Sequence, residues 1–308
     1  MIVLGSINID LIAKVTHLPI AGETLLGKEL ITVPGGKGAN QAVAIARLGV
    51  PVQMVGRVGG DSFGLQLLDS LKTAGVQTQG IFIDNTVNSG IAIIAVDDNG
   101  ENQIIVIPGA NDRLNEIDIK TLENLLPNAS ALLLQLEIPL PIVLLAAKAA
   151  KKAGVKVILD PAPVREELPA EIYNLVDIIT PNQIEAQQLT SITINNIETA
   201  ALAAEILQKK GVETAIVKLG AQGAVCATSE KIFFIPAFPV TVIDTIAAGD
   251  AFNGGLAVAL AEGLTLRQAT TWAAAVAALC VTKTGAQSAM PDRTTFHTFL
   301  QQITPSIS

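Results

Sequence analysis

Aromatic side chains are scarce in this chain of 308 residues, at 3% of the total, with one tryptophan and one tyrosine. Proteins that bind single-stranded nucleic acid stack its bases on aromatic rings, so this scarcity argues against that function. Basic residues are outnumbered too. The formal net charge of −8 argues against binding a phosphate backbone, which requires clustered lysine and arginine. We therefore expect no nucleic-acid partner, although a small phosphorylated ligand needs only local donors.

Cysteine and long apolar runs are also rare. Cys226 and Cys280 lie far apart in apolar stretches, which favours two reduced, buried thiols over a disulfide framework or a zinc site. No run reaches the roughly 18 uninterrupted apolar residues expected of a membrane span. The first residues carry no basic segment followed by a long apolar stretch. These absences favour a cytoplasmic protein with no membrane partner.

Along the chain, short β-branched runs alternate with longer segments that have helical periodicity. The runs are continuously apolar rather than alternating, as in strands buried on both faces of a parallel sheet. We expect strands at 2–7, 52–59, 131–136, 155–160, 177–180, 214–220 and 231–237, and helices at 39–48, 62–74, 140–152, 196–210, 250–262 and 266–281. This alternation predicts a layered α/β fold.

Two stretches, 11–33 and 90–108, break this alternation because they hold several strand-like pieces and little helix. The pieces 91–96 and 103–108 are joined by DDNGEN, a strong hairpin signal since Asn-Gly tolerates positive φ. We expect these stretches to leave the main sheet and pair as a small β-sheet, serving as a lid or a dimer surface. The core would then comprise 1–10, 34–89 and 109–308.

The strongest motif is VIDTIAAGDAFNGGLAVALAEG at 242–263, in which a turn of small residues precedes a helix. Small residues allow the N–H groups of Ala247, Ala248, Gly249 and Asp250 to face one point. With the positive end of the helix dipole, these donors would form an anion site. An acid beside that site has a natural task in accepting the proton of a hydroxyl that attacks phosphorus. The alternative is an ordinary helix start with an acid in its first turn.

A second turn-and-helix motif, PGGKGANQAVAIARLG at 34–49, places three glycines and a lysine before a helix. It is not a Walker A loop, because Lys37 is followed by Gly38 rather than by Ser or Thr. Gly36 would let a ligand hydroxyl reach the backbone, and Asn40 offers the donor and acceptor that sugar recognition requires. Lys37 could meet a phosphate. The alternative is a tight turn with a solvated lysine, which is favoured if this motif is taken alone.

Acidic residues stand at three further strand ends or helix starts. Asp10 follows the first strand and could grip two sugar hydroxyls, or cap a turn. Glu137 follows the strand at 131–136, at the end where ligands bind in open α/β sheets. Asn182 and Glu185 lie three apart at a helix start. They could orient Mg²⁺ through its waters, or form only an N-cap and its partner glutamate.

Taken together, GGKGANQAVAIARLG and DTIAAGDAFNGGLAVAL resemble the two signature motifs of the ribokinase-like family of carbohydrate kinases. The likeness continues in order through GSINIDLI, GETLLG, PGAN, LLLQLE, LDPAP, DIITPNQIEA and VTKTGAQSAMP. It implies a three-layer α/β/α sandwich with a mostly parallel sheet, and a β-sheet lid that often makes a homodimer contact. It implies ATP-dependent phosphorylation of D-ribose at the 5-hydroxyl. The alternatives are a fructokinase-like, nucleoside or other small-sugar kinase, or a non-catalytic sugar-binding regulator.

The resemblance also implies roles for single residues. Asp250 would be the catalytic base, and the amides of Ala247, Ala248 and Gly249 the anion hole. The sugar would be held by Asn8, Asp10, Gly36, Asn40 and Glu137, with Lys37 nearby. Asn182 and Glu185 would arrange Mg²⁺ and the phosphates, and the nucleotide would be bordered by Lys218, Gly220, Gly223, Ala248 and Gly249. A monovalent cation, usually K⁺, would be held by the Asp244 carboxylate and carbonyls of Ile246, Cys280, Lys283 and Gly285, beside Ala289.

Some positions depart from the family pattern without removing a catalytic group. Ala289 stands where a serine hydroxyl often contacts the cation, with Ser288 adjacent. Ala221 replaces a serine often seen near the phosphates, and Ala273 replaces a residue that is often polar beside the adenine. Cation binding and adenine recognition are therefore the features in which this chain departs from the family pattern.

Overall fold

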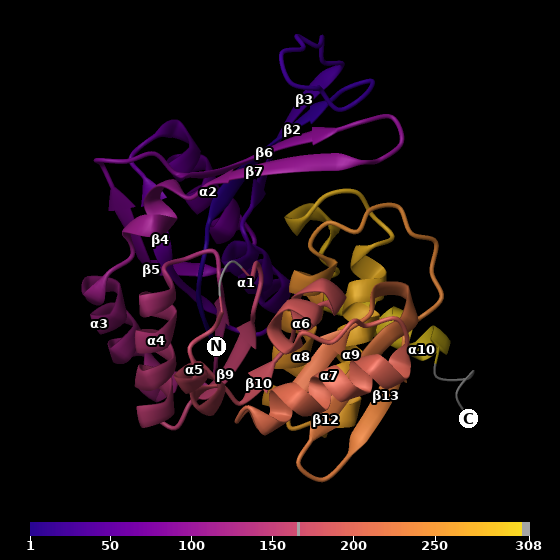
Figure 1. Cartoon of the computed structure of the whole chain (residues 1–308). Helices are drawn as coiled ribbons and strands as arrows, with labels where there is room; N and C mark the ends of the chain where they lie inside the picture. The colour runs from indigo at the N-terminus through magenta and orange to yellow at the C-terminus, as the bar shows by residue number, and fades with distance from the viewer. Residues whose placement is uncertain (165–166, 304–308) are drawn as a thin grey trace.

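The computed structural model describes residues 1–164 and 167–303, and it contains a nine-stranded sheet and a separate four-stranded sheet (Figure 1). The larger sheet has the strand order β13 (Ile232–Pro236), β12 (Gly223–Thr228), β11 (Thr214–Lys218), β10 (Ile178–Ile179), β9 (Lys156–Asp160), β8 (Ala131–Gln135), β1 (Ile2–Leu4), β4 (Gln53–Gly59) and β5 (Gln77–Asp84). All neighbouring pairs from β11 to β5 are parallel, whereas β12 is antiparallel to both of its neighbours. The predicted mostly parallel α/β fold is confirmed.

Helices cover both faces of this sheet. One face packs against α1 (Lys37–Arg47), α2 (Ser62–Thr73), α8 (Ala248–Ala261), α9 (Leu266–Cys280) and α10 (Arg293–Ile303). The other face packs against α3 (Glu116–Leu125), α4 (Leu140–Lys152), α5 (Ala170–Leu175), α6 (Gln183–Thr190) and α7 (Ile197–Lys209). None of the helices in the described ranges combines the length and apolarity that a bilayer crossing requires.

Side-chain alternation explains why the strands are continuously apolar. In β1, Val3 belongs to the core under α1 and α8, while Ile2 and Leu4 belong to the opposite core. In β8, Leu133 contacts the first core and its two neighbours contact the second. Because successive side chains point to opposite faces, every position of a strand covered on both sides must be apolar.

The four-stranded sheet projects from the core as a second layer (Figure 1). Its order is β3 (Glu29–Gly35), β2 (Asn8–Lys14), β6 (Gly90–Val96) and β7 (Asn102–Ile107). The predicted hairpin pairs Ile91 with Ile107, and Gly100 takes φ 83° in its turn. The sheet begins at Asn8 and includes Gly35, so it extends beyond the predicted segment 11–33 at both ends, because those residues continue the β2–β3 ladder.

The second sheet joins the core at a junction built around Asn111, which lies in the 3₁₀ turn Gly109–Arg113. Asn111 Oδ1 accepts a hydrogen bond from Ile7 N at 2.9 Å, and its Nδ2 donates to Asn8 Oδ1 at 2.7 Å. A Cβ atom on Gly90, where β6 begins, would lie 2.2 Å from Asn111 Nδ2. The Asn111 side chain therefore holds the chain where β2 begins. The first residue of β6 has to be glycine, because a larger residue would collide with Asn111.

Several elements differ from the sequence-based expectation. The sequence patterns did not predict β5, β12, α3, α5 or α10, whose segments are short, rich in small residues or interrupted by polar ones. Helix α1 begins at Lys37, so the lysine lies in the helix rather than in the turn before it.

A buried charge cluster ties α3 to the larger sheet. Arg57 of β4 donates through Nε and Nη2 to Asp118 of α3, at 2.9–3.1 Å, and Asp84 of β5 lies 3.5 Å from its Nη1. Asp118 is fully buried and also accepts a hydrogen bond from Asn115 N, the N-cap of α3. Removing Asp118 would leave the buried Arg57 guanidinium with only the longer contact to Asp84.

We expect Asp118→Ala to lower the free energy of unfolding by about 3–5 kcal/mol, because the buried Arg57 guanidinium loses its hydrogen bonds to this carboxylate. Urea unfolding of the variant and the native chain measures this difference. The matched control is Glu123→Ala on the exposed face of the same helix, which we expect to change stability by less than about 0.5 kcal/mol. Equal losses in the two variants would contradict this account of the cluster.

Candidate active site

A cavity of about 550 Å³ opens where β9 and β11 end and α8 begins. Its lining contains many of the predicted residues: Lys37, Asn182, Glu185, Lys218, Gly220, Gly223, Ala247, Ala248, Gly249 and Asp250. The opposite wall is apolar and includes Phe238, Val240, Phe252, Ala277 and Val281. A ligand with a flat apolar part and a charged part would match this division of the walls.

The first turn of α8 is shaped by an alanine in the left-handed conformation. Ala247, the N-cap, has φ 58° and offers no side-chain cap. Ala248 N donates to Thr245 O at 3.3 Å, so one predicted anion-hole amide is partly engaged. Within the described residues no hydrogen bond occupies the amides of Ala247, Gly249 and Asp250. These free amides, at the positive end of a helix dipole, can bind an anion.

Asp250 stands next to these amides and is held by two side-chain amides of α1. Asn40 Nδ2 donates to Asp250 Oδ2 at 3.0 Å, and Gln41 Nε2 donates to Oδ1 at 3.1 Å. Burial raises the pKa of Asp250 to about 6, and the nearby Lys37 ammonium opposes this rise. A carboxylate with this pKa is ionised at neutral pH and can accept a proton from an alcohol.

Lys37 lies near four carboxylates, each of which favours its charged form. Burial alone would lower the pKa of Lys37, but the nearby Asp250, Asp160, Glu137 and Glu185 raise it above its ordinary value. No carboxylate of the described chain lies within 4.0 Å of its ammonium, so it forms no direct ion pair there. A charged, unpaired ammonium that lines the cavity is available to an anionic ligand.

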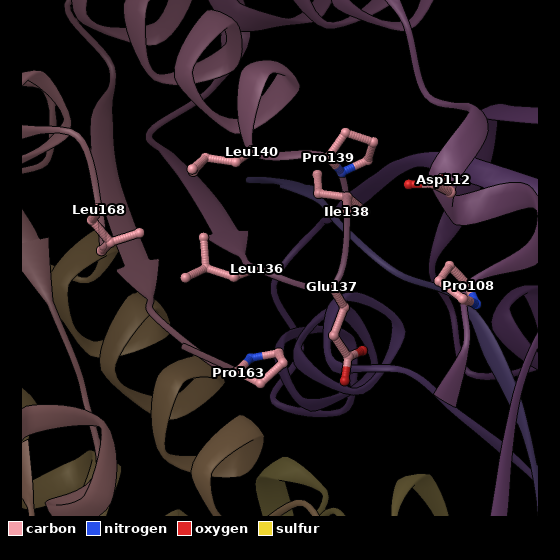
Figure 2. Close-up of a pocket in the computed structure, with 9 residues that line it drawn as sticks. All are labelled: Pro108, Asp112, Leu136, Glu137, Ile138, Pro139, Leu140, Pro163 and Leu168. Atoms are coloured by element: carbon pink, nitrogen blue, oxygen red, sulfur yellow. The ribbon is translucent and has the colours of Figure 1, made fainter. Parts of the chain in front are cut away.

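Glu137 follows β8 and borders a second cavity, of about 200 Å³ (Figure 2). Pro108, Asp112 and Pro163 line this cavity together with Glu137 (Figure 2). Ser6 Oγ donates to Glu137 Oε2 at 2.5 Å, and Lys37 N donates to the same oxygen at 3.1 Å. The glutamate therefore fixes the start of α1, and its Oε1 accepts no hydrogen bond within the described chain.

Asp10 of β2 brings the second sheet to the site. Its pKa is raised to about 7, mainly by burial and in smaller part by the nearby Glu137 and Asp250 carboxylates. Gly35 leaves room for this side chain, because a Cβ there would lie 2.2 Å from Asp10 Oδ2. Asn8 differs from the other predicted sugar residues, since its side-chain oxygen accepts from Asn111 at the junction.

Gly36 is the residue that lets β3 pass into α1 so near to the site. It has φ 88°, and a Cβ would lie 2.7 Å from Asn8 N and 2.9 Å from Ser6 O. Any other residue would therefore meet both an unfavourable backbone conformation and two backbone clashes. Backbone atoms of residues 6–8 make this close approach, and the predicted approach of a ligand hydroxyl to Gly36 stays a prediction.

On the nucleotide side, Asn182 and Glu185 form a reciprocal capping box at the start of α6. Asn182 N donates to Glu185 Oε2 at 2.8 Å, and Glu185 N donates to Asn182 Oδ1 at 2.9 Å. Burial raises the pKa of Glu185, and Asp160 adds to the rise. No group of three His, Cys, Asp or Glu residues in the described chain could hold a metal directly. Asn182 and Glu185 offer amide and carboxylate oxygens of the kind that contact Mg²⁺ through its own waters.

The segment predicted to hold a monovalent cation is organised by Asp244. Its Oδ1 accepts from Ile246 N and its Oδ2 from Gly285 N, both at 2.9 Å. Cys280 Sγ lies 3.9 Å from Ile246 O, and burial raises the pKa of this thiol to about 12. Ser288 donates to Thr284 O and is turned into its own loop. The Asp244 carboxylate thus ties the segment of Ile246 to the loop of Gly285, and its oxygens are of the kind that a hard cation takes.

Sequence reasoning missed three buried side chains at the centre of the site: Gln41, Gln135 and Asp160. Asp160 ends β9 beside Gln135, which ends β8, and it pairs with Lys218 at 3.0 Å. Asp160 lay within the quoted LDPAP stretch, so the rule that ligands gather at strand ends would have found it. One expectation was misplaced: Ala273 packs in the α8–α9 contact against Gly255, and its neighbour Ala274 lines the cavity.

Comparison with known proteins gives one consistent result. The family model described as pfkB family carbohydrate kinase matches residues 1–293. The chain is 42% identical to a ribokinase of Haemophilus influenzae over 97% of both chains, and 36% identical to a deoxyribokinase of Salmonella typhi over 97% of both. The solved structure of Arabidopsis thaliana ribokinase complexed with ribose and ATP matches with a TM-score of 0.90 and 36% identity, covering 97% of this chain and 98% of that one.

The environment of Asp10 predicts a pH-dependent stability. Its pKa is about 7 in the folded chain against 3.8 in the ordinary state, so the folded chain binds the proton more tightly. The free energy of unfolding contributed by this group is therefore greatest below pH 3.8 and falls as the pH rises to about 7. Asp10→Asn removes this loss, so the variant should be more stable than the native chain at about pH 8, by a few kcal/mol, and equal to it at about pH 4.

Urea unfolding at the two pH values measures this difference. The exposed Asp69→Asn is the control for removing one carboxylate from the surface, and we expect it to leave the pH dependence unchanged. A stability gain for Asp10→Asn that is the same at both pH values would show that Asp10 does not titrate as described.

Proposed function

The chain belongs to the pfkB family of carbohydrate kinases, and we propose that it transfers the γ-phosphoryl group of ATP to the 5-hydroxyl of D-ribose, giving D-ribose 5-phosphate and ADP. One observation carries this proposal. Asp250 stands at the free amides of α8 and is hydrogen-bonded to Asn40, between the large cavity and the predicted sugar residues. A proton acceptor placed between an anion site and a polyol site suits transfer of a phosphoryl group to an alcohol.

The chain's own residues divide the work of such a transfer. Asp250 accepts the proton of the sugar hydroxyl as the oxygen bonds to phosphorus, while the amides of Ala247, Ala248 and Gly249 face the charge on the phosphoryl oxygens. Asp10, Asn40 and Glu137 orient the sugar by accepting and donating hydrogen bonds, together with Asn8 and the backbone at Gly36. Lys37 supplies a positive charge between the two substrates.

The nucleotide occupies the large cavity in this proposal. Its adenine packs on the apolar wall, and its phosphates approach Lys218, whose Nζ would lie 3.3 Å from a Cβ on Gly249. Gly220 and Gly223 line the same cavity. Asn182 and Glu185 would hold Mg²⁺ through water, and the ion would neutralise phosphate charge. Asp244 and the carbonyls of Ile246, Cys280, Lys283 and Gly285 would hold K⁺, with the buried Ala289 contributing no side-chain oxygen.

The chemistry of the two thiols agrees with a reducing compartment. Cys226 and Cys280 are both free and buried in the described chain. Together with the dependence on ATP, this supports our proposal of a cytoplasmic enzyme.

Replacing the proposed base gives the direct test. We expect Asp250→Asn to keep the fold and ribose binding but to reduce turnover by about 10²–10⁴, the range expected for loss of a general base. An ATP-coupled assay measures turnover, and calorimetry measures ribose binding. Turnover equal to that of the native chain would show that Asp250 is not the base.

The same assay on a panel of acceptors tests the substrate. Ribose should give the highest kcat/KM, above 2-deoxyribose, fructose and nucleosides, in the presence of Mg²⁺ and with K⁺ added or omitted. Deoxyribose enters the panel because of the deoxyribokinase similarity. Another acceptor outrunning ribose would replace the substrate assignment while leaving the reaction class in place.

We also propose that two copies of the chain associate through the second sheet. Strand β7 is one edge of this sheet and, among the strands of the described ranges, pairs with β6 alone. It exposes Ile104, Ile105, Val106 and Ile107 on both faces, with Ile105 at 62%. An apolar edge strand left in water is a site of association, and a second copy of the same edge would cover it.

We expect Ile105→Asp to convert a dimer into a monomer, because a buried unpaired carboxylate opposes association. Sedimentation velocity measures the mass at a fixed protein concentration. Gln103→Asp, which adds the same charge to the same strand at a residue that is already polar, is the matched control and should stay dimeric. A native chain that sediments as a monomer would overturn this assignment.

A further inference from the structure

Gln41 connects two carboxylates that come from different parts of the fold. It lies on α1 and is buried, with 1% of its surface exposed. Its Nε2 donates to Asp250 Oδ1 of α8 and to Asp160 Oδ2 of β9, both at 3.1 Å. One NH₂ group thus uses each of its two protons on a different carboxylate.

Gln135 determines which end of that amide faces the carboxylates. Gln135 Nε2 donates to Gln41 Oε1 at 2.6 Å. The carbonyl end of Gln41 is therefore engaged on the side away from Asp250, which leaves only the NH₂ end for the two acids. If the amide were turned round, the Gln41 oxygen would face two carboxylates and its NH₂ group would face the NH₂ group of Gln135. That orientation is therefore excluded.

The charges around Asp250 show why this orientation matters. Lys37 of α1 faces it with positive charge, while Asp160 of β9, Asp10 of β2 and the Cys280 thiol of α9 lie near it on other elements. Asp160 in turn pairs with Lys218 of β11, whose Nζ approaches the first turn of α8 at Gly249. Two acids that repel one another are thus kept close by one neutral donor group.

We propose that Gln41 is a positioning residue of this enzyme: its NH₂ group fixes the orientation of the Asp250 carboxylate toward the acceptor alcohol and holds Asp160 and Lys218 in register with it, and Gln135 sets that amide. Gln41 itself touches neither substrate. The inference rests on the proposed function in one respect, namely that Asp250 is the group that receives the proton of the acceptor.

The test compares Gln41→Met with the native chain. Met fills the same volume but donates no hydrogen bond, so Asp250 gains freedom to rotate and loses a group that favours its charged form. We expect kcat to fall by on the order of 10- to 100-fold, with KM for the sugar and for ATP each changed by less than roughly threefold. The acidic limb of the kcat/KM profile should move to higher pH by roughly half a unit to one unit. Gln66→Met, on the exposed face of α2, is the control and should change none of these.

A second variant keeps the test valid if Gln41→Met does not fold. Gln41→Glu preserves shape, and its activity relative to the native chain should rise as the pH falls, because protonation restores a donor toward the two acids. Gln135→Met should give the same direction of change as Gln41→Met with a smaller size.

The outcomes separate the two proposals. A native chain that phosphorylates ribose, with an unmoved acidic limb in Gln41→Met and no pH-dependent recovery in Gln41→Glu, overturns the role of Gln41 and leaves the function standing. A native chain that prefers another acceptor overturns the substrate assignment, and the same profiles measured on that acceptor decide the role of Gln41. A loss of thermal stability with unchanged pH profiles would assign Gln41 a purely structural role and overturn the inference.

Discussion

The site depends on keeping a carboxylate charged where water hardly reaches it. Asp250 is 5% exposed, and burial of this kind favours the protonated form. Three neighbours work against that tendency: the Lys37 ammonium and the side-chain amides of Asn40 and Gln41. All three lie within the first turns of α1, so one short helical segment sets the electrostatics of a residue that is some two hundred positions away in the chain. The sheet has to bring α1 and α8 together before the carboxylate can be useful.

The fold achieves this by collecting ends of elements. Strands β8, β9 and β11 end with Gln135, Asp160 and Lys218 at the same side of the sheet, where the carboxyl ends of its parallel strands lie. Helices α6 and α8 begin at that side. Strand ends supply side chains that are anchored on rigid backbone, while helix starts supply free amides. The second sheet adds Asp10 from above this edge. The reacting groups are therefore gathered from distant parts of the sequence, and each one stands on a regular element.

The sequence was sufficient for the parts of the structure that repeat a local rule. Continuous apolar runs predicted β1, β8 and β9, and the Asn-Gly turn predicted the β6–β7 hairpin, because backbone preference and burial agree in those segments. It was insufficient where a residue's role depends on a contact distant in sequence. Gln41 and Gln135 lie in ordinary helix and strand patterns, and only folding shows that they meet. Asn182 and Glu185 form a capping box and also line the cavity. The spacing of the two residues is the same for both roles, so it does not distinguish a structural role from a functional one.

Strand β2 links the junction with the core to the projecting sheet. It runs without interruption from Asn8 at the junction, through Asp10 at the site, to Lys14 in the outer part of the projecting sheet. Seven residues of strand span roughly 23 Å, and the ladder to β3 and β6 stiffens them along their whole length. The strand therefore connects Asp10 rigidly to the outer sheet, and a displacement of that sheet about the Asn111 junction would carry the Asp10 carboxylate with it.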